Sequence, residues 1–156
     1  MTLLDGGQWN PFISSDQGKT LLFSFADIEN SDHDPNSYDC LLFAYDNNAN
    51  GMDDGNSERF GYRLSENAVK IRSGNAGCSQ SGWIKLSDDQ TIRITGLSFS
   101  PRAIRLSTGQ RLLKCQIDIV LEGALISNPL INLRLEQQLT IANLITDPSG
   151  QAALCK

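Results

Sequence analysis

Strict alternation of apolar and polar residues over residues 131–141 most constrains the fold of this chain. In INLRLEQQLTI, every second residue from Ile131 to Ile141 is apolar except Gln137. Successive side chains of a β-strand point to opposite faces, whereas a helix would spread these apolar residues around its circumference. The pattern predicts a strand with one buried face, and Gln137 predicts a bulge or a sheet edge within it.

Residues 114–125, KCQIDIVLEGAL, alternate in the same way. The residues expected on one face of this second strand are Cys115, Ile117, Ile119 and Leu121. The connection between the two strands contains Asn128-Pro129, a turn signal. These features together predict an antiparallel β-hairpin.

Further short strands are expected upstream, separated by polar turns. Their ranges are 20–28, 38–46, 59–64, 68–72, 82–86 and 91–101. Ser65-Glu66-Asn67 fits a compact hairpin connection, and residues 102–113 fit either a strand or an irregular loop. Because no amphipathic helix is visible, we predict a mainly β single domain over residues 1–156, with an antiparallel sheet of about eight short strands.

Composition and motifs exclude several classes of function. The formal charge is −5, and no two of the 13 basic residues are adjacent, which argues against nucleic-acid binding. No apolar run approaches the roughly 18 residues of a membrane-spanning helix. Because the sequence also lacks GxSxG, HExxH and phosphate-binding glycine motifs, we expect a protein that is not an enzyme and has no catalytic residues.

The four cysteines predict two disulfides. Cys40, Cys78, Cys115 and Cys155 are even in number and none of them belongs to a CxxC motif. A zinc site built from all four remains the alternative. Disulfides indicate an oxidising compartment, yet the chain begins with no secretory signal. We therefore expect that an N-terminal segment has been removed.

An Asp- and Asn-rich loop follows the expected strand 38–46. Calcium prefers six to eight oxygen ligands, and short Asp and Asn side chains at alternate positions around a glycine supply them. The candidate ligands are Asp46, Asn48, Asn50, Met52, Asp54 and Glu58. Glu58 comes one residue later than the bidentate acid of an EF-hand loop, and no flanking helices are expected. A polar Asn/Asp/Gly turn without metal is the alternative.

The order of several motifs resembles the PilW-like minor pilins of type IV pili. The motifs are YDCLLFAYDNNANG, ERFGYRLSENAVKIR, a cysteine in a glycine-rich loop, GWIKLSDD and IRITGLSFSP. The resemblance covers about residues 38–101 and, more loosely, 113–143. It implies the soluble periplasmic domain of a minor pilin without its N-terminal helix, and an α+β pilin fold for the full-length protein.

That resemblance implies a subunit that helps initiate pilus assembly and sits at or near the pilus tip. Its partners would be other minor and major pilins, and only the missing helix would contact the membrane. It would lie in the periplasm or inner membrane before assembly and in the extracellular pilus afterwards. The alternatives are a calcium-dependent extracellular adhesin or binding module, and a minor pseudopilin of a secretion system.

Of three possible cysteine pairings, we predict Cys40–Cys78 and Cys115–Cys155. The first bridge would tie a central strand to the glycine-rich loop. The second would hold the C-terminal tail against a strand, as C-terminal disulfides do in many pilins.

Overall fold

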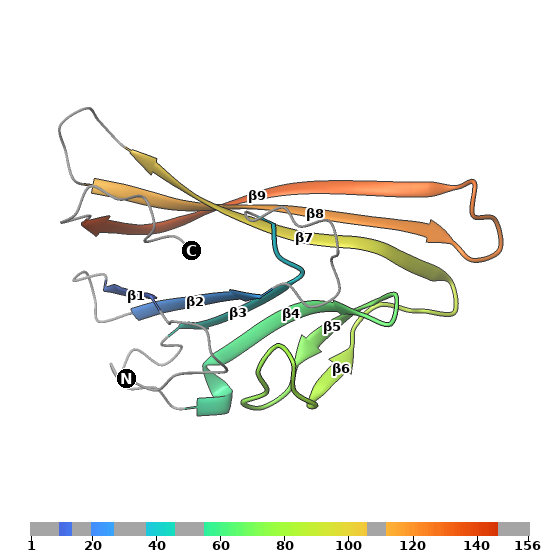
Figure 1. Cartoon of the computed structure of the whole chain (residues 1–156), viewed down its shortest axis with the longest axis horizontal. Coiled ribbons are helices and arrows are strands. Elements are labelled where there is room, and N and C mark those ends of the chain that lie inside the picture. The colour runs from blue at the N-terminus through green and yellow to red at the C-terminus, as the bar shows by residue number, and fades with distance from the viewer. Residues whose placement is uncertain (1–9, 14–19, 27–36, 46–54, 106–111, 147–156) are drawn as a thin grey trace.

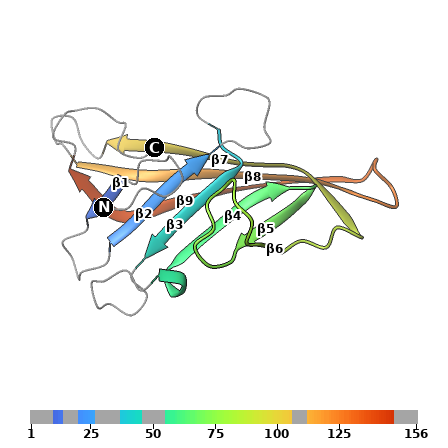
Figure 2. The same ribbon diagram turned by 60° about the horizontal axis from the view of Figure 1, so that its bottom comes forward.

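In the described part of the computed structural model of the chain, nine antiparallel strands form two stacked sheets (Figure 1). The structure describes residues 10–13, 20–26, 37–45, 55–105 and 112–146. Figure 2 shows that the strands of one sheet cross those of the other obliquely. The expectation of a mainly β chain is therefore confirmed, but its strands are divided between two sheets.

The first sheet is a six-stranded meander in which neighbours in sequence are neighbours in space. Its strands are β1 (Asn10–Ile13), β2 (Thr20–Ala26), β3 (Cys40–Tyr45), β4 (Arg59–Ser65), β5 (Ala68–Arg72) and β6 (Trp83–Lys85). A single 3₁₀ turn, η1 (Gly55–Ser57), precedes β4. The two residues between β4 and β5, Glu66 and Asn67, have φ values of 54° and 57°. Positive φ at both positions is typical of a two-residue type I′ hairpin, and the compact hairpin connection predicted here is confirmed.

The second sheet has three long strands in the order β7-β8-β9. They are β7 (Ile92–Arg105), β8 (Leu112–Leu125) and β9 (Asn132–Thr146). The β8–β9 hairpin confirms the prediction from alternation and from Asn128-Pro129. The uncertain range 102–113 contains the end of β7 and the start of β8.

The core lies between the two sheets. Its buried side chains come from β3, β7 and β8: Leu41, Leu97, Phe99, Cys115 and Ile117. Phe43 of β3 adds an aromatic cluster, since its ring stacks on Phe60 at 5.4 Å and on Tyr62 at 6.2 Å between centroids. Tyr38 joins the sheets through the backbone, because its N–H donates to Phe99 O (3.0 Å) and its carbonyl accepts from Phe99 N (2.7 Å). The segment just before β3 therefore links the two layers through backbone hydrogen bonds.

The outer face of β3 is covered by the loop of residues 73–82, which we call the cap loop. Cys40 of β3 and Cys78 of the cap loop form the predicted disulfide. Trp83 packs beside this bridge, and its indole Nε1 donates to Gly77 O at 3.0 Å. The guanidinium of Arg63 lies 4.7 Å from the centre of the Trp83 ring and donates to Cys78 O. Trp83 is thus a packing residue.

Glycine at position 61 of β4 makes this covering possible. A Cβ atom there would lie 2.8 Å from Leu42 Cδ2, 2.9 Å from Leu41 O and 3.2 Å from the Trp83 ring. The absence of a side chain lets the Trp83 ring pack closely against β4.

Three expectations need correction or stay untested. There are nine described strands rather than about eight, and they form two sheets rather than one. The apolar face of β9 is exposed rather than buried. The described residues contain one disulfide, and the second predicted pair involves Cys155, which lies outside them.

Candidate interaction surface

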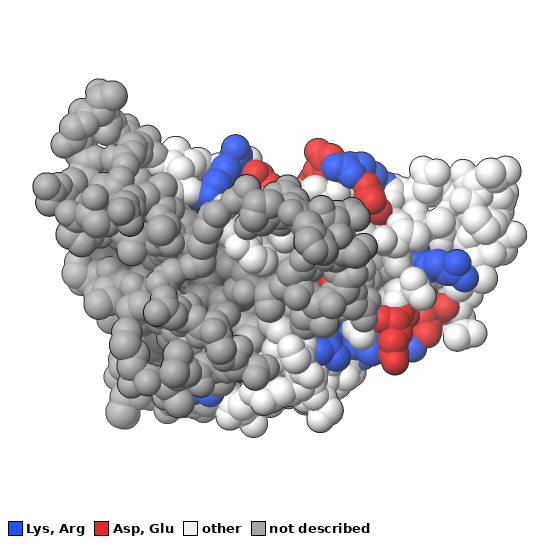
Figure 3. Space-filling view, in the orientation of Figure 1, with Lys and Arg blue, Asp and Glu red and all other residues white. Residues whose placement is uncertain are grey.

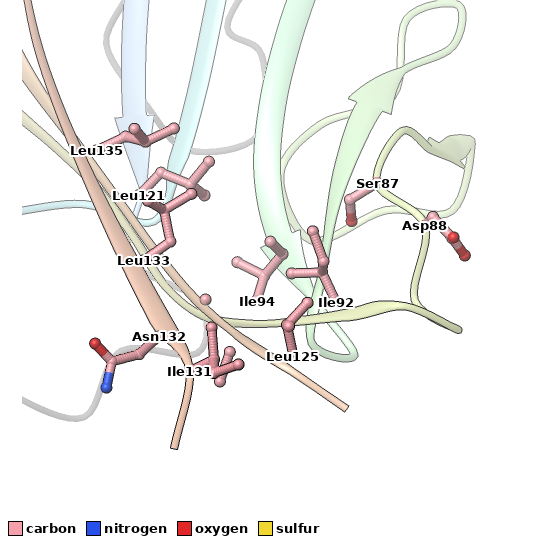
Figure 4. A pocket seen from close by; sticks show the side chains of 12 residues that line it. Ser87, Asp88, Ile92, Ile94, Leu121, Leu125, Ile131, Asn132, Leu133 and Leu135 are labelled. Carbon is pink, nitrogen blue, oxygen red and sulfur yellow. The ribbon is translucent and has the colours of Figure 1, made fainter. Parts of the chain in front are cut away.

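An apolar groove of about 570 Å³ lies on the inner face of the three-stranded sheet, against the loop that leads into β7 (Figure 4). Three strands, this loop and the β8–β9 connection supply the residues that line it. They are Ser87, Asp88, Ile92, Ile94, Leu121, Gly123, Ala124, Leu125, Ile131, Asn132, Leu133 and Leu135. In Figure 4, Leu121, Leu133 and Leu135 point to the same side of β8 and β9.

Strand length explains why this face is uncovered. β8 and β9 have 14 and 15 residues, whereas β5 and β6 have five and three. At about 3.3 Å per residue, each of the two long strands is some 30 Å longer than β5. The β8–β9 end of the upper sheet accordingly projects beyond the lower sheet in Figure 1. Its apolar side chains therefore have no opposing layer among the described elements.

The side chains of β9 show the consequence. Every residue from 126 to 140 is exposed. The relative exposure is 59 % for Leu133, 51 % for Leu135 and 47 % for Leu139. Scattered apolar residues are normal on protein surfaces, but a contiguous apolar stripe beside a groove marks an interaction site. This stripe is the strongest candidate for a functional surface in the described part of the chain.

The rim of the groove is a hydrogen-bonded acidic turn. Asp88 accepts hydrogen bonds from Thr91 Oγ1 (2.7 Å) and from the backbone N–H of Gln90 (3.0 Å). These bonds favour the charged carboxylate and lower the pKa of Asp88. Lys85 forms an ion pair with Asp89, which raises the pKa of the lysine and lowers that of the aspartate. The turn therefore places an ionised carboxylate beside an apolar surface.

The opposite face of β9 is polar and carries both charges. Arg134 Nε lies 2.7 Å from Glu136 Oε1, and its Nη1 contacts Glu122 on β8. Bonds to Glu136 and then Glu122 raise the pKa of Arg134. Gln138 donates to Asp118 at 2.8 Å. Figure 3 shows basic and acidic side chains interspersed on the visible described surface, without a large area of one sign.

Most of the predicted calcium loop lies outside the described residues. Asp46, Asn48, Asn50, Met52 and Asp54 belong to that part of the chain. Glu58, the remaining candidate, is described and is only 2 % exposed at the start of β4. Among the described residues, no group of three His, Cys, Asp or Glu side chains is placed to hold a metal ion. The calcium site stays a prediction.

The helices in the described residues include none that is long and apolar enough to span a membrane.

Sequence reasoning placed Leu133, Leu135 and Leu139 in a buried face and so missed the groove. Strand length was the signal that could have revealed it. The alternating run near the C-terminus is much longer than the upstream strands AVKIR and GWIKL, which are too short to cover it.

Comparison with known proteins identifies a matching family. A family described as prepilin peptidase-dependent protein B matches residues 7–141, which is most of the chain. No curated protein and no solved structure matches it.

Proposed function

Because the chain belongs to the prepilin peptidase-dependent protein B family, we propose that it is a minor pilin without enzymatic activity. The family makes it a prepilin peptidase-dependent, pilus-related protein. The narrower assignment, a PilW-like subunit that helps initiate a type IV pilus at or near its tip, is our proposal. It draws on the motif order over residues 38–101.

The exposed apolar stripe of β9 is the single observation that best supports this proposal. Leu133 and Leu135 line the groove while more than half exposed. A pilus subunit works through surfaces that contact neighbouring subunits, and complete burial of such a side chain contributes roughly 1.5–3 kcal/mol. We propose that an apolar segment of another pilin occupies the groove, with its polar side towards Asp88. The sites of action would be the periplasm and then the extracellular fibre.

Piliation of the native bacterium tests this proposal. Leu135→Glu would place a charge in the groove, and we expect few or no pili on cells that carry it. Ile84→Glu is the matched control, because Ile84 is 58 % exposed on β6 and does not line the groove. Cells with the control should make normal numbers of pili by electron microscopy. Equal piliation in both strains, with both proteins folded and present, would contradict the role of the groove.

Deletion of the gene separates the family-level role from the role of the groove. If a deletion strain still makes normal pili, the chain is not needed for assembly, and the pseudopilin or adhesin alternatives gain support. A calcium-dependent function also stays a proposal, based on the composition of the loop from Asp46 to Asp54.

A further inference from the structure

Strand β9 is a long sheet edge. Among the described residues it pairs only with β8, so the backbone groups along its other side have no ladder partner there. From Asn132 to Thr140 its register with β8 is unbroken, and every residue from 131 to 140 is exposed. Long, regular edges of this kind are templates for another strand, and proteins usually block them with bulges, prolines or inward-pointing charges. The register shift of this hairpin lies beyond Thr140, and 132–140 contains no proline.

We propose that two copies of this chain pair antiparallel along β9, around a two-fold axis that passes through Leu135. In this register Leu135 lies opposite the partner's Leu135. Arg134 lies opposite the partner's Glu136, and symmetry produces the same pair a second time. On the apolar face, Ile131 lies opposite the partner's Leu139.

Charge selects this register over its neighbours. The apolar faces of both β9 strands must stay on the same side of the joined sheet. The allowed registers therefore each place the two-fold axis at a residue, and neighbouring registers differ by one residue in the position of the axis. An axis at Arg134 places two arginines opposite each other, and an axis at Glu136 places two glutamates opposite each other. An axis at Gln137 pairs Arg134 with the partner's Thr140 and leaves both charges without an opposite partner. Opposite charges across strands stabilise a sheet and like charges destabilise it.

The monomer presents these groups ready for pairing. Arg134 and Glu136 already lie on the same outer face of β9, 2.7 Å apart between Nε and Oε1, and their side chains are 55 % and 63 % exposed. A two-fold axis perpendicular to the sheet joins the two three-stranded sheets into one of six strands. The apolar faces of both β9 strands then lie on the same side, so the two grooves meet. This dimer is independent of the proposed pilus function, since it follows from the edge of β9 alone.

The mass of the purified protein as a function of concentration is the first test. Sedimentation equilibrium should show the average mass rising from the 17.1 kDa of one chain towards twice that value. A mass that stays at one chain up to about 1 mM, the weakest affinity worth considering, would overturn the proposal.

Charge reversal supplies a sharper test. Glu136→Lys alone and Arg134→Glu alone each place like charges opposite each other twice, and each should weaken dimerisation by about tenfold or more. Mixed together, the two variants restore both opposite-charge pairs and should form a heterodimer tighter than either homodimer. Arg102→Glu is the matched control. It makes the same charge reversal on β7, where Arg102 pairs with Asp118, and should leave dimerisation unchanged. If the mixture associates no better than the single variants, the register is wrong.

Cross-linking locates the axis without charge changes, and it remains informative if Arg134→Glu fails to fold beside Glu122. Opposed residues of antiparallel strands have Cα atoms about 4.5–5.5 Å apart, within the range of a disulfide. Leu135→Cys should therefore give a covalent dimer on oxidation. Leu133→Cys places the two thiols roughly 13 Å apart along the strands and should not. Gln137→Cys should also stay monomeric, and preferential cross-linking of Leu133→Cys or Gln137→Cys would overturn the axis at Leu135.

Discussion

Removal of the Cys40–Cys78 bridge tests how the cap loop stabilises the six-stranded sheet. The variant Cys40→Ala/Cys78→Ala avoids an unpaired buried thiol, because both cysteines are at most 5 % exposed. The other contacts of the cap loop stay in place, including the Arg63–Trp83 stacking and the bond from Trp83 to Gly77. We therefore expect the variant to fold and to lose mainly the constraint that the bridge places on the unfolded chain.

The size of that constraint follows from the length of chain that the bridge encloses. The cysteines are 38 positions apart, and in the chain-entropy model a loop of this length contributes about 4 kcal/mol at 25 °C. Unfolding entropy near 60 °C is about 2.1 cal/mol/K per residue, or roughly 0.33 kcal/mol/K for this chain. The expected fall in Tm is therefore about 12 °C.

Thermal and urea unfolding of the oxidised proteins provide the measurement. The wild type and Ser79→Ala, an exposed neighbour of Cys78, should unfold together, with the double variant well below both. Because the unfolded variant is less constrained and exposes more surface, its m value should also rise. If Tm falls by less than about 3 °C, on the same entropy scale, the reasoning is refuted. The hydrogen bonds and packing of the cap loop would then stabilise the fold more than the disulfide does.

Three further predictions concern other parts of the molecule. Gly61→Ala should lower the free energy of unfolding by about 1–3 kcal/mol through overpacking against Leu42, measured as a lower urea midpoint; an unchanged midpoint would show that β3 and β4 separate easily. If the loop beginning at Asp46 binds calcium, the Tm of the wild type should be higher in millimolar calcium than in chelator. Asp46→Ala should abolish this increase. Superimposable wild-type melting curves would mean that the loop is only a polar turn. The lowered pKa of Asp88 means that its stabilising bonds are fully present above its ordinary pKa of 3.8 and are lost as pH falls through the lowered value. Thr91→Val removes the main donor, so an NMR titration should show the pKa of Asp88 moving up, and an unmoved pKa would contradict the assignment.

Local patterns in the sequence predict much of the strand content. The alternation of residues 114–125 and 131–141, with Asn128-Pro129 between them, predicts the β8–β9 hairpin that the structure contains. The pairing of Cys40 with Cys78 was also predicted. Strand β1 was not, because it has four residues and includes Pro11. Proline cannot donate to a ladder, but β1 is the edge of its sheet among the described strands and tolerates it.

The exposed surface was beyond prediction for a different reason. Alternation identifies the apolar face of a strand, but the burial of that face depends on what lies opposite. Ile117 and Leu135 lie in similar alternating patterns, yet Ile117 is 1 % exposed in the core between the sheets while Leu135 is 51 % exposed. The difference arises from the unequal lengths of β5 and β9 in two sheets that the sequence did not separate.

The bridge between Tyr38 and Phe99 has a consequence for the order of folding. Hairpins such as β4–β5 and β8–β9 close short loops and form on a microsecond scale. The Tyr38–Phe99 hydrogen bonds and the packing of Leu41 on Phe99 join segments far apart in sequence, so they require a long loop to close first. The layers therefore dock late. Until β7 and β8 have been synthesised, β3 has no core to join, and the nascent chain carries exposed apolar strands that are vulnerable to aggregation.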